Sequence, residues 1–400
     1  MRKLVEQFVF GPEKNQTKAY YKVKKEALKR GIFLASIAPF YKQIATGDTT
    51  GLSVPAFNIR TLTFDIACSI FKTAKKSKAS AFILEIASSE MEYTRQTPQE
   101  FAFCVLKAAV KEKYKGPIFL QGDHFYLKNT SHEAIKGLEN LILQAFAAGF
   151  YNIDIDCSDL ALEDNIKYTN YFIEFIKKNQ PVGIEVTIGG EVSSIGGAET
   201  TQTGLEDFLK RVQGACPVQS ERNEAFNGIT KVSCQTGTRH GGIVLPSGGI
   251  EKISINFENI RCLGEVAKQY ATTGVVQHGA STLQNDQFDG LRRAGALEVH
   301  LSTLFSDIIF DSRYFPKELK EKMYSWVEQN FPEQRKNFTT DQQFIKVFRK
   351  RSLGIFKKEI WLMPSRNIKG ICQELEEKFL FFFKIFNVND TEKLIKKIYN

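Results

Sequence analysis

Eight short runs of apolar and β-branched residues recur through the middle of the chain, and most are separated by stretches with helical periodicity. The runs lie at residues 52–57, 81–86, 117–120, 152–156, 182–188, 231–235, 274–277 and 296–301. Residues 63–77 and 131–148 each place their apolar side chains on one helical face. Strands that alternate with helices imply parallel strands joined by right-handed crossovers. Eight such units over about 250 residues predict a (β/α)8 barrel.

An open, doubly wound sheet is the alternative fold, but no GxGxxG turn follows the first predicted strand. The flanks differ from the barrel. We expect one or two helices over residues 1–47, the barrel over 48–315 and a helical, Lys- and Glu-rich extension over 316–400. Phe381, Phe382 and Phe383 are consecutive and cannot share one helical face, so we expect this helix to be buried on several sides, against a second subunit in a homo-oligomer.

The composition limits the class of protein. Of the 400 residues, 42% are hydrophobic and 25% are charged, which excludes disorder for most of the chain. No apolar stretch approaches the ~18 residues of a membrane span, and the first residues lack a signal-peptide core. Seven cysteines without a CxxC pair indicate reduced thiols. We therefore expect a cytoplasmic protein that does not bind membranes.

The formal net charge of +9 is compatible with nucleic acid, an acidic membrane or an anionic small molecule as partner. No nucleic-acid motif and no stacking platform of aromatic residues accompanies the basic residues. We expect most of them to be solvated surface lysines, and phosphorylated substrates to account for any functional share.

Polar residues gather where the predicted strands end. Four of the five histidines, His124, His240, His278 and His300, lie at strand ends, and only His132 lies on a predicted helix. A single histidine in such a place is more often a hydrogen-bonded structural residue. Several on neighbouring strands favour a metal site, because three imidazoles with a carboxylate or water suit catalytic Zn²⁺. In a (β/α)8 barrel, this end of the strands carries the chemistry.

Short motifs at these positions resemble the class II, metal-dependent ketose-bisphosphate aldolases, in order from Val54 to about Thr303. The matching segments are Val54-Pro-Ala-Phe-Asn58, Asp123-His124, Ile155-Asp-Cys-Ser158 with Glu163-Asp-Asn-Ile166, Glu191-Val-Ser-Ser-Ile-Gly-Gly197, Gly237-Thr-Arg-His-Gly241 and His278-Gly-Ala-Ser281. The resemblance implies a zinc-dependent lyase that cleaves a ketose bisphosphate, such as fructose 1,6-bisphosphate, to dihydroxyacetone phosphate and an aldehyde.

The resemblance also implies roles for single residues. His124, His240 and His278 would hold Zn²⁺, and Glu191 would serve a second or alternative metal arrangement, with a further divalent or a monovalent cation. Asp123 would be the general acid/base at the C4 hydroxyl, and Glu199 would move the proton at the enediolate carbon. The residues implied to contact substrate or its phosphate are Asn58, Gly241, Gly279, Ser281, Ser302 and Thr303.

Three observations depart from the family pattern or leave a role open. The eighth predicted strand ends in His300-Leu-Ser302-Thr303 where the family usually has Asn-Ile-Asp-Thr. His300 would replace the substrate-contacting asparagine, and Arg239 could bind a phosphate bidentately. Each site carboxylate has a structural alternative, and Ser302 and Thr303 could instead cap a helix. Asp156 could orient a ligand histidine.

Two further functions stay open. One is a non-catalytic barrel subunit that stabilises a partner aldolase. The other is an aldolase, or another metal-barrel enzyme, that acts on a different sugar phosphate. Because a scaffold would not need three imidazoles at strand ends, the enzyme is the favoured interpretation.

Overall fold

The structure is a computed structural model that describes residues 1–213, 228–239 and 241–399. Within these ranges the strands are β1 (Ile32–Ala35), β2 (Val54–Asn58), β3 (Ile83–Ala87), β4 (Gly116–Tyr126), β5 (Asn152–Asp156), β6 (Thr187–Glu191), β7 (Lys231–Ser233), β8 (Val275–Gln277) and β9 (Glu298–Leu301). The helices up to the last strand are α1 (Arg2–Val9), α2 (Glu13–Leu28), α3 (Ala38–Ala45), α4 (Thr63–Ser77), α5 (Ser88–Thr94), α6 (Pro98–Glu112), α7 (His132–Ala147), α8 (Leu162–Asn179), α9 (Gln202–Gln213), α10 (Phe257–Gln269), η1 (Ala280–Thr282) and α11 (Asn285–Arg293). Those after it are α12 (Thr303–Asp311), α13 (Lys317–Asn330), α14 (Pro332–Arg335), α15 (Asp341–Phe348), η2 (Arg349–Ser352), α16 (Lys357–Trp361), α17 (Ser365–Ile385) and α18 (Glu392–Tyr399). No helix in these ranges is long and apolar enough to cross a membrane.

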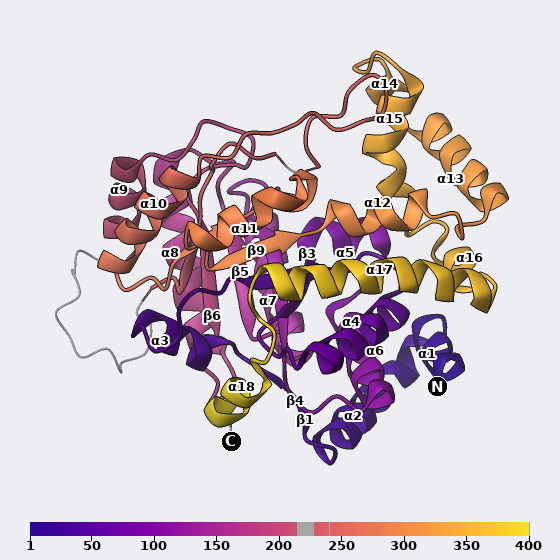
Figure 1. Cartoon of the computed structure of the whole chain (residues 1–400), viewed down its shortest axis with the longest axis horizontal. Helices are drawn as coiled ribbons and strands as arrows, with labels where there is room; N and C mark the ends of the chain where they lie inside the picture. Colours follow the sequence, from indigo (N-terminus) through magenta and orange to yellow (C-terminus); the bar gives the residue numbers. More distant parts are fainter. Residues whose placement is uncertain (214–227, 240, 400) are drawn as a thin grey trace.

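Eight of the described strands, β2 to β9, form a closed parallel barrel. The hydrogen-bonded order runs β4-β3-β2-β9-β8-β7-β6-β5, and β5 pairs again with β4. Each of the eight overlaps one of the apolar runs, so the predicted (β/α)8 barrel is confirmed. Helices surround it, as Figure 1 shows.

The front segment contains a strand that the sequence pattern did not predict. Besides α1, α2 and α3, residues 1–47 include β1, which pairs in parallel with the first part of β4 from Ile32↔Gly116 to Ala35↔Phe119. The second part of β4 pairs with β5. Because β4 is longer than its neighbours, it carries two partners in succession on the same side.

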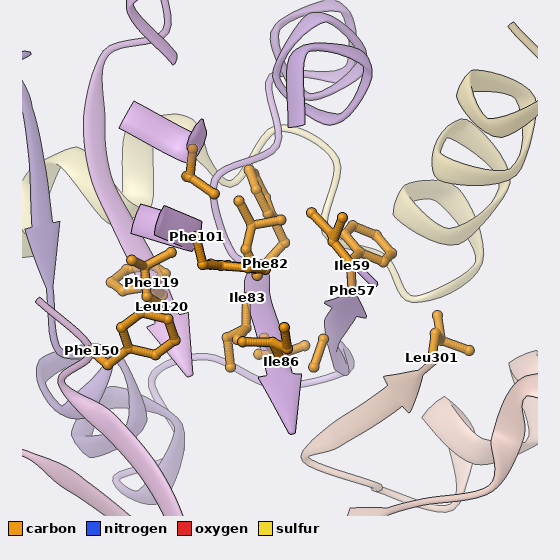
Figure 2. Close-up of a cluster of buried hydrophobic side chains, with 14 of the residues drawn as sticks. Phe57, Ile59, Phe82, Ile83, Ile86, Phe101, Phe119, Leu120, Phe150 and Leu301 are labelled. Carbon is orange, nitrogen blue, oxygen red and sulfur yellow. The ribbon is translucent and has the colours of Figure 1, made fainter. Parts of the chain in front are cut away.

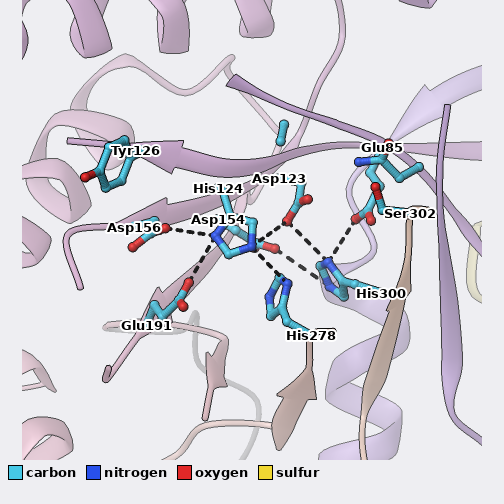
Figure 3. Close-up of polar contacts among 12 residues, drawn as sticks. Glu85, Asp123, His124, Tyr126, Asp154, Asp156, Glu191, His278, His300 and Ser302 are labelled. Carbon is cyan, nitrogen blue, oxygen red and sulfur yellow. Dashed lines mark hydrogen bonds and ion pairs between the residues drawn. The ribbon is translucent and has the colours of Figure 1, made fainter. Parts of the chain in front are cut away.

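An irregularity in β4 aims the Asp123-His124 pair. Between Gly122 and Phe125 the register with β5 shifts by one residue, and His124 has a φ of 40°. In a regular strand, adjacent side chains point to opposite faces, whereas a bulge can turn both toward one side. Gly122 is required here, because a Cβ would lie 2.3 Å from the Phe125 ring. The bulge brings Asp123 and His124 into one site (Figure 3).

The extension after residue 316 completes the barrel's apolar packing. On α17, Phe379, Phe382 and Phe383 are fully buried, and the ring centroids of Phe57 and Phe379 lie 5.2 Å apart. Phe57 belongs to the aromatic and aliphatic core beside β2 and β3 in Figure 2. Of the three consecutive phenylalanines, Phe382 and Phe383 are buried within this chain, and Phe381 is half-buried beside Phe288. Their burial does not require a second subunit, and the homo-oligomer stays a prediction.

Candidate metal and substrate site

A cavity of about 290 Å³ opens at the carboxyl ends of the barrel strands. It brings together residues that the sequence predicted to act as one site: Asp123, His124, Gly241, His278, Gly279, Ser281, His300, Ser302 and Thr303. They come from the ends of β4, β8 and β9 and from the loop after β7. This is the end of a (β/α)8 barrel at which active sites are found.

Two imidazoles converge in this cavity. His124 Nε2 lies 3.0 Å from His278 Nδ1, and Asp123 Oδ1 lies 3.9 Å from the same His124 atom. One ligand atom from each of the three residues lies within 4.8 Å of the others, a spacing that can hold a metal ion. Figure 3 shows the three side chains directed toward one another.

Carboxylates fix the far side of the His124 ring. Its Nδ1 lies 2.8 Å from Asp156 Oδ2 and 3.1 Å from Glu191 Oε2. Asp156 also accepts hydrogen bonds from the Ser158 backbone N–H and hydroxyl, so the carboxylate is itself held in place. A carboxylate on one ring nitrogen leaves the other nitrogen directed toward a cation. Glu191 thus contacts His124 on the side opposite the His278 ring.

The charge around His124 favours a cation. Burial disfavours the protonated ring, but the Asp123 and Glu191 carboxylates outweigh burial and raise the pKa of His124 well above its ordinary value. Burial, together with the Asp156 charge, raises the pKa of Glu191 to about 7. The same excess of carboxylates also favours a divalent cation.

His300 lies deeper than the sequence suggested. Its Nδ1 lies 3.1 Å from Glu85 Oε2 and 3.3 Å from Asp123 Oδ1, and its Nε2 lies 2.9 Å from Glu298 Oε2. Burial lowers the pKa of His300, but the carboxylates around it, Glu85 first, raise the pKa well above its ordinary value. An imidazolium here holds the Asp123 carboxylate in position from the side away from His124.

A buried ionic network below His300 fills the barrel interior. Lys231 Nζ lies 2.6 Å from Gln121 Oε1, 2.5 Å from Glu298 Oε2 and 3.0 Å from Asp154 Oδ1. The Tyr41 hydroxyl donates to the other oxygen of Glu298. None of these was predicted as a site residue. The available signal was a charged residue in each of three otherwise apolar strands, Glu85, Lys231 and Glu298.

A second buried ion pair, also missed, borders the cavity. Arg60 forms a salt bridge with Glu90 at 2.6 Å and donates to the Ser302 hydroxyl. Asn58, expected to touch substrate, donates to Glu90 at 2.6 Å and does not line the cavity. Ser302 is the N-cap residue of α12, but its side chain makes no capping bond.

Besides Asn58 and Glu191, two predicted residues do not line the cavity, and a third cannot be placed. Glu199 is exposed and accepts a hydrogen bond from Asn256 at 3.2 Å. Arg239 is also exposed, beside Gly196. His240, the third predicted zinc ligand, lies outside the described residues.

Comparisons with known proteins show the family of the chain. The family model of "Fructose-bisphosphate aldolase class-II" matches residues 41–359. No curated protein sequence matches the chain. Among solved structures, the YdjI aldolase from Escherichia coli K12 is 16% identical with a TM-score of 0.54, covering 89% of this chain and 98% of that one. Fructuronate-tagaturonate epimerase UxaE from Cohnella laeviribosi is 11% identical with a TM-score of 0.58, covering 84% and 81%.

At such identities, the structural likeness concerns the fold alone, since one barrel supports many reactions. The family match is different in kind, because it spans most of the chain, including the bulged Asp123-His124 pair and His278. The chain belongs to the class II fructose-bisphosphate aldolase family.

Proposed function

We propose that the protein is a zinc-dependent aldolase that splits a ketose bisphosphate, such as fructose 1,6-bisphosphate, into dihydroxyacetone phosphate and an aldehyde, or joins them. One observation carries the proposal: the converging His124 and His278 rings share a cavity with Asp123 and with Gly279, Ser281 and Ser302. A metal site beside a carboxylate and a set of phosphate donors is what this cleavage needs.

The donor set fits Zn²⁺. The two ring nitrogens that face each other, 3.0 Å apart, offer nitrogen ligands, and the Asp156 contact fixes the orientation of His124. His240 is the third ligand implied by the family motif. When bound, the ion supplies Lewis-acid polarisation of the ketose carbonyl.

The chain's own residues perform the remaining steps. Asp123 takes the proton of the C4 hydroxyl as the C3–C4 bond breaks, and returns it in the condensation direction. Its position between His300 and His124 keeps the carboxylate aimed at the cavity. Backbone N–H groups at Gly241 and Gly279 and the hydroxyls of Ser281, Ser302 and Thr303 hold the phosphate of the three-carbon product. Glu199 would act on the proton at the enediolate carbon of the three-carbon product, after the loop that carries Glu199 moves toward the cavity.

Aldol cleavage of fructose and tagatose 1,6-bisphosphates by the purified full chain tests this function, with a chelator and with zinc added back. We expect cleavage that stops on chelation and returns with zinc. A zinc-loaded protein that cleaves neither sugar would refute the proposed substrate and favour another ketose phosphate. A protein that binds no zinc would support the non-catalytic scaffold.

A further inference from the structure

Part of the cavity lining is basic and belongs to the C-terminal extension. Lys350 and Arg351, both on η2, line the same 290 Å³ cavity as Gly279, Ser281 and Ser302. Lys350 also lines a neighbouring cavity of about 120 Å³, beside Arg60 and Thr303. A segment far from the barrel in the sequence thus faces the phosphate donors.

Contacts on two sides hold η2 in this place. Arg349 lies 2.6 Å from Asp307 Oδ1 and pairs with Asp311, both on α12, and it stacks over the Phe310 ring at 4.9 Å. On the other side, the Gly354 N–H donates to the Tyr93 carbonyl at 3.1 Å.

The approach to α5 admits only glycine at residue 354, where a Cβ would lie 2.3 Å from the Tyr93 carbonyl oxygen. Arg351 covers the Tyr93 ring at 5.3 Å. Fixed between α12 and α5, η2 presents Lys350 in one direction, toward the cavity.

The basic residues of this region differ in whether their charge is compensated. Lys346 and Arg349 pair with Asp307 and Asp311, and Arg60 pairs with Glu90. The side chain of Lys350, which is half-buried, has no hydrogen-bond or ion-pair partner among residues 1–213, 228–239 and 241–399.

The surroundings of Lys350 disfavour an uncompensated charge. Burial, followed by the Arg60 charge, lowers the pKa of Lys350 to about 8. The Arg351 charge contributes to this lowering, while Glu90 on α5 and Asp307 on α12 partly offset it. A cation placed beside another cation, with a cavity in front of it, is relieved when an anion binds there.

We propose that Lys350 binds the substrate's phosphate dianion together with the Gly279, Ser281 and Ser302 donors, so that the C-terminal extension completes the substrate site. The inference rests on the proposed function for the identity of the ligand. It gives the basic extension a specific role: it holds a positively charged side chain in place, and this charge selects substrates with a phosphate at this end of the cavity.

Calorimetric titration of the zinc-loaded full chain with inorganic phosphate and with dihydroxyacetone phosphate tests the inference. In Lys350→Met, we expect both dissociation constants to rise by about tenfold or more, since a hydrogen bond to a charged group is lost. Lys358→Met is the matched control, because Lys358 is an exposed lysine of the same extension that does not line the cavity. Its affinities should equal those of the wild type.

Lys350→Arg separates charge from packing. An arginine keeps its charge at every pH used, so this variant should bind phosphate at pH 7, whereas the wild type should lose affinity as the pH rises through about 8 and the arginine variant should not. Equal melting temperatures of the variants would exclude misfolding as the cause.

Two results would overturn the inference: no phosphate binding by the wild type, or equal affinity in Lys350→Met. Its failure is distinguishable from that of the aldolase proposal. Lys350-dependent phosphate binding without any aldol cleavage would refute the aldolase alone. Cleavage with an unchanged KM in Lys350→Met would refute the role of Lys350 alone.

Discussion

The mouth of the barrel and its interior both hold dense clusters of polar side chains, yet the two clusters are built on opposite plans. Inside, the Lys231 ammonium contacts Gln121, Glu298 and Asp154, so the lysine and these two carboxylates are paired within the protein. At the mouth, the nitrogens of His124 and His278 point at each other, and carboxylates hold the ring of His124 from behind. In a self-compensated cluster, the loss of one partner leaves a buried charge uncompensated and destabilises the fold, whereas groups that converge on one point are arranged to receive a ligand.

The largest effect that would test this contrast is on activity. His278→Ala should abolish zinc binding and reduce aldol cleavage to background, because a converging ligand is lost, with little change in unfolding free energy. Metal analysis and a cleavage assay measure both. His132→Ala, at the exposed start of α7, should change neither. Full zinc occupancy in His278→Ala would remove this residue from the metal site.

The next effect separates the ligand from the proton carrier. Asp123→Ala should keep bound zinc and lower kcat about 10²- to 10⁴-fold, the usual contribution of a general acid/base. Stopped-flow or steady-state cleavage with parallel metal analysis measures this. Asp286→Ala, which removes an exposed carboxylate at the start of α11, serves as the control. An unchanged kcat would reject Asp123 as the acid/base.

The interior cluster should respond in the opposite way. Lys231→Met leaves Glu298 and Asp154 buried without their cation, which should cost about 3–5 kcal/mol of unfolding free energy. Urea unfolding measures the loss. Lys72→Met breaks an exposed pair with Glu376 and should cost at most about 1 kcal/mol. If the two losses were equal, the interior network would have no special part in stability.

The smallest effect concerns an ion pair at the surface end of η2. Burial raises the pKa of Asp311, but Arg349 and Lys346 outweigh it and lower the pKa to about 2. A carboxyl with a depressed pKa stabilises the fold above its unfolded pKa near 4 and loses that contribution as the pH falls toward 2. Asp311→Asn should therefore flatten the decline of stability between pH 4 and 2, by less than about 1 kcal/mol because the group is half exposed. Thermal melts across this pH range measure it, and an unchanged decline would contradict it.

The sequence predicted the barrel well because its strands are short apolar runs with clear helical stretches between them. It also predicted about half of the residues that line the cavity, since polar residues at the carboxyl ends of parallel strands must meet. It did not predict β1, because four apolar residues between helices are compatible with a helix as well as a strand, even though Gly31 precedes them. The bulge at His124 depends on pairing with β5, which no local pattern records.

Other features required tertiary information. Lys231 on β7 and Glu298 on β9 are 67 positions apart, and they meet only because both side chains point into the barrel. Lys350 resembles any basic residue of the extension until η2 docks on α12 and α5. At Phe382 and Phe383 the sequence suggested a contact with a second subunit, because no partner for this apolar helix was visible. The partner is the barrel of the same chain.

The position of α17 late in the sequence also affects how the chain folds during its synthesis. Phe57 and Phe82 on the early strands pack against Phe379 and Phe383, about 320 residues later in the chain. At a synthesis rate of about 5–20 residues per second, roughly 15 to 60 s separate these partners on the ribosome. During that time the apolar side chains on the outer face of the first strands are not covered by α17 and are prone to aggregation. We expect the nascent chain to depend on chaperones until its last segment is released, and chains that stop before α17 to aggregate.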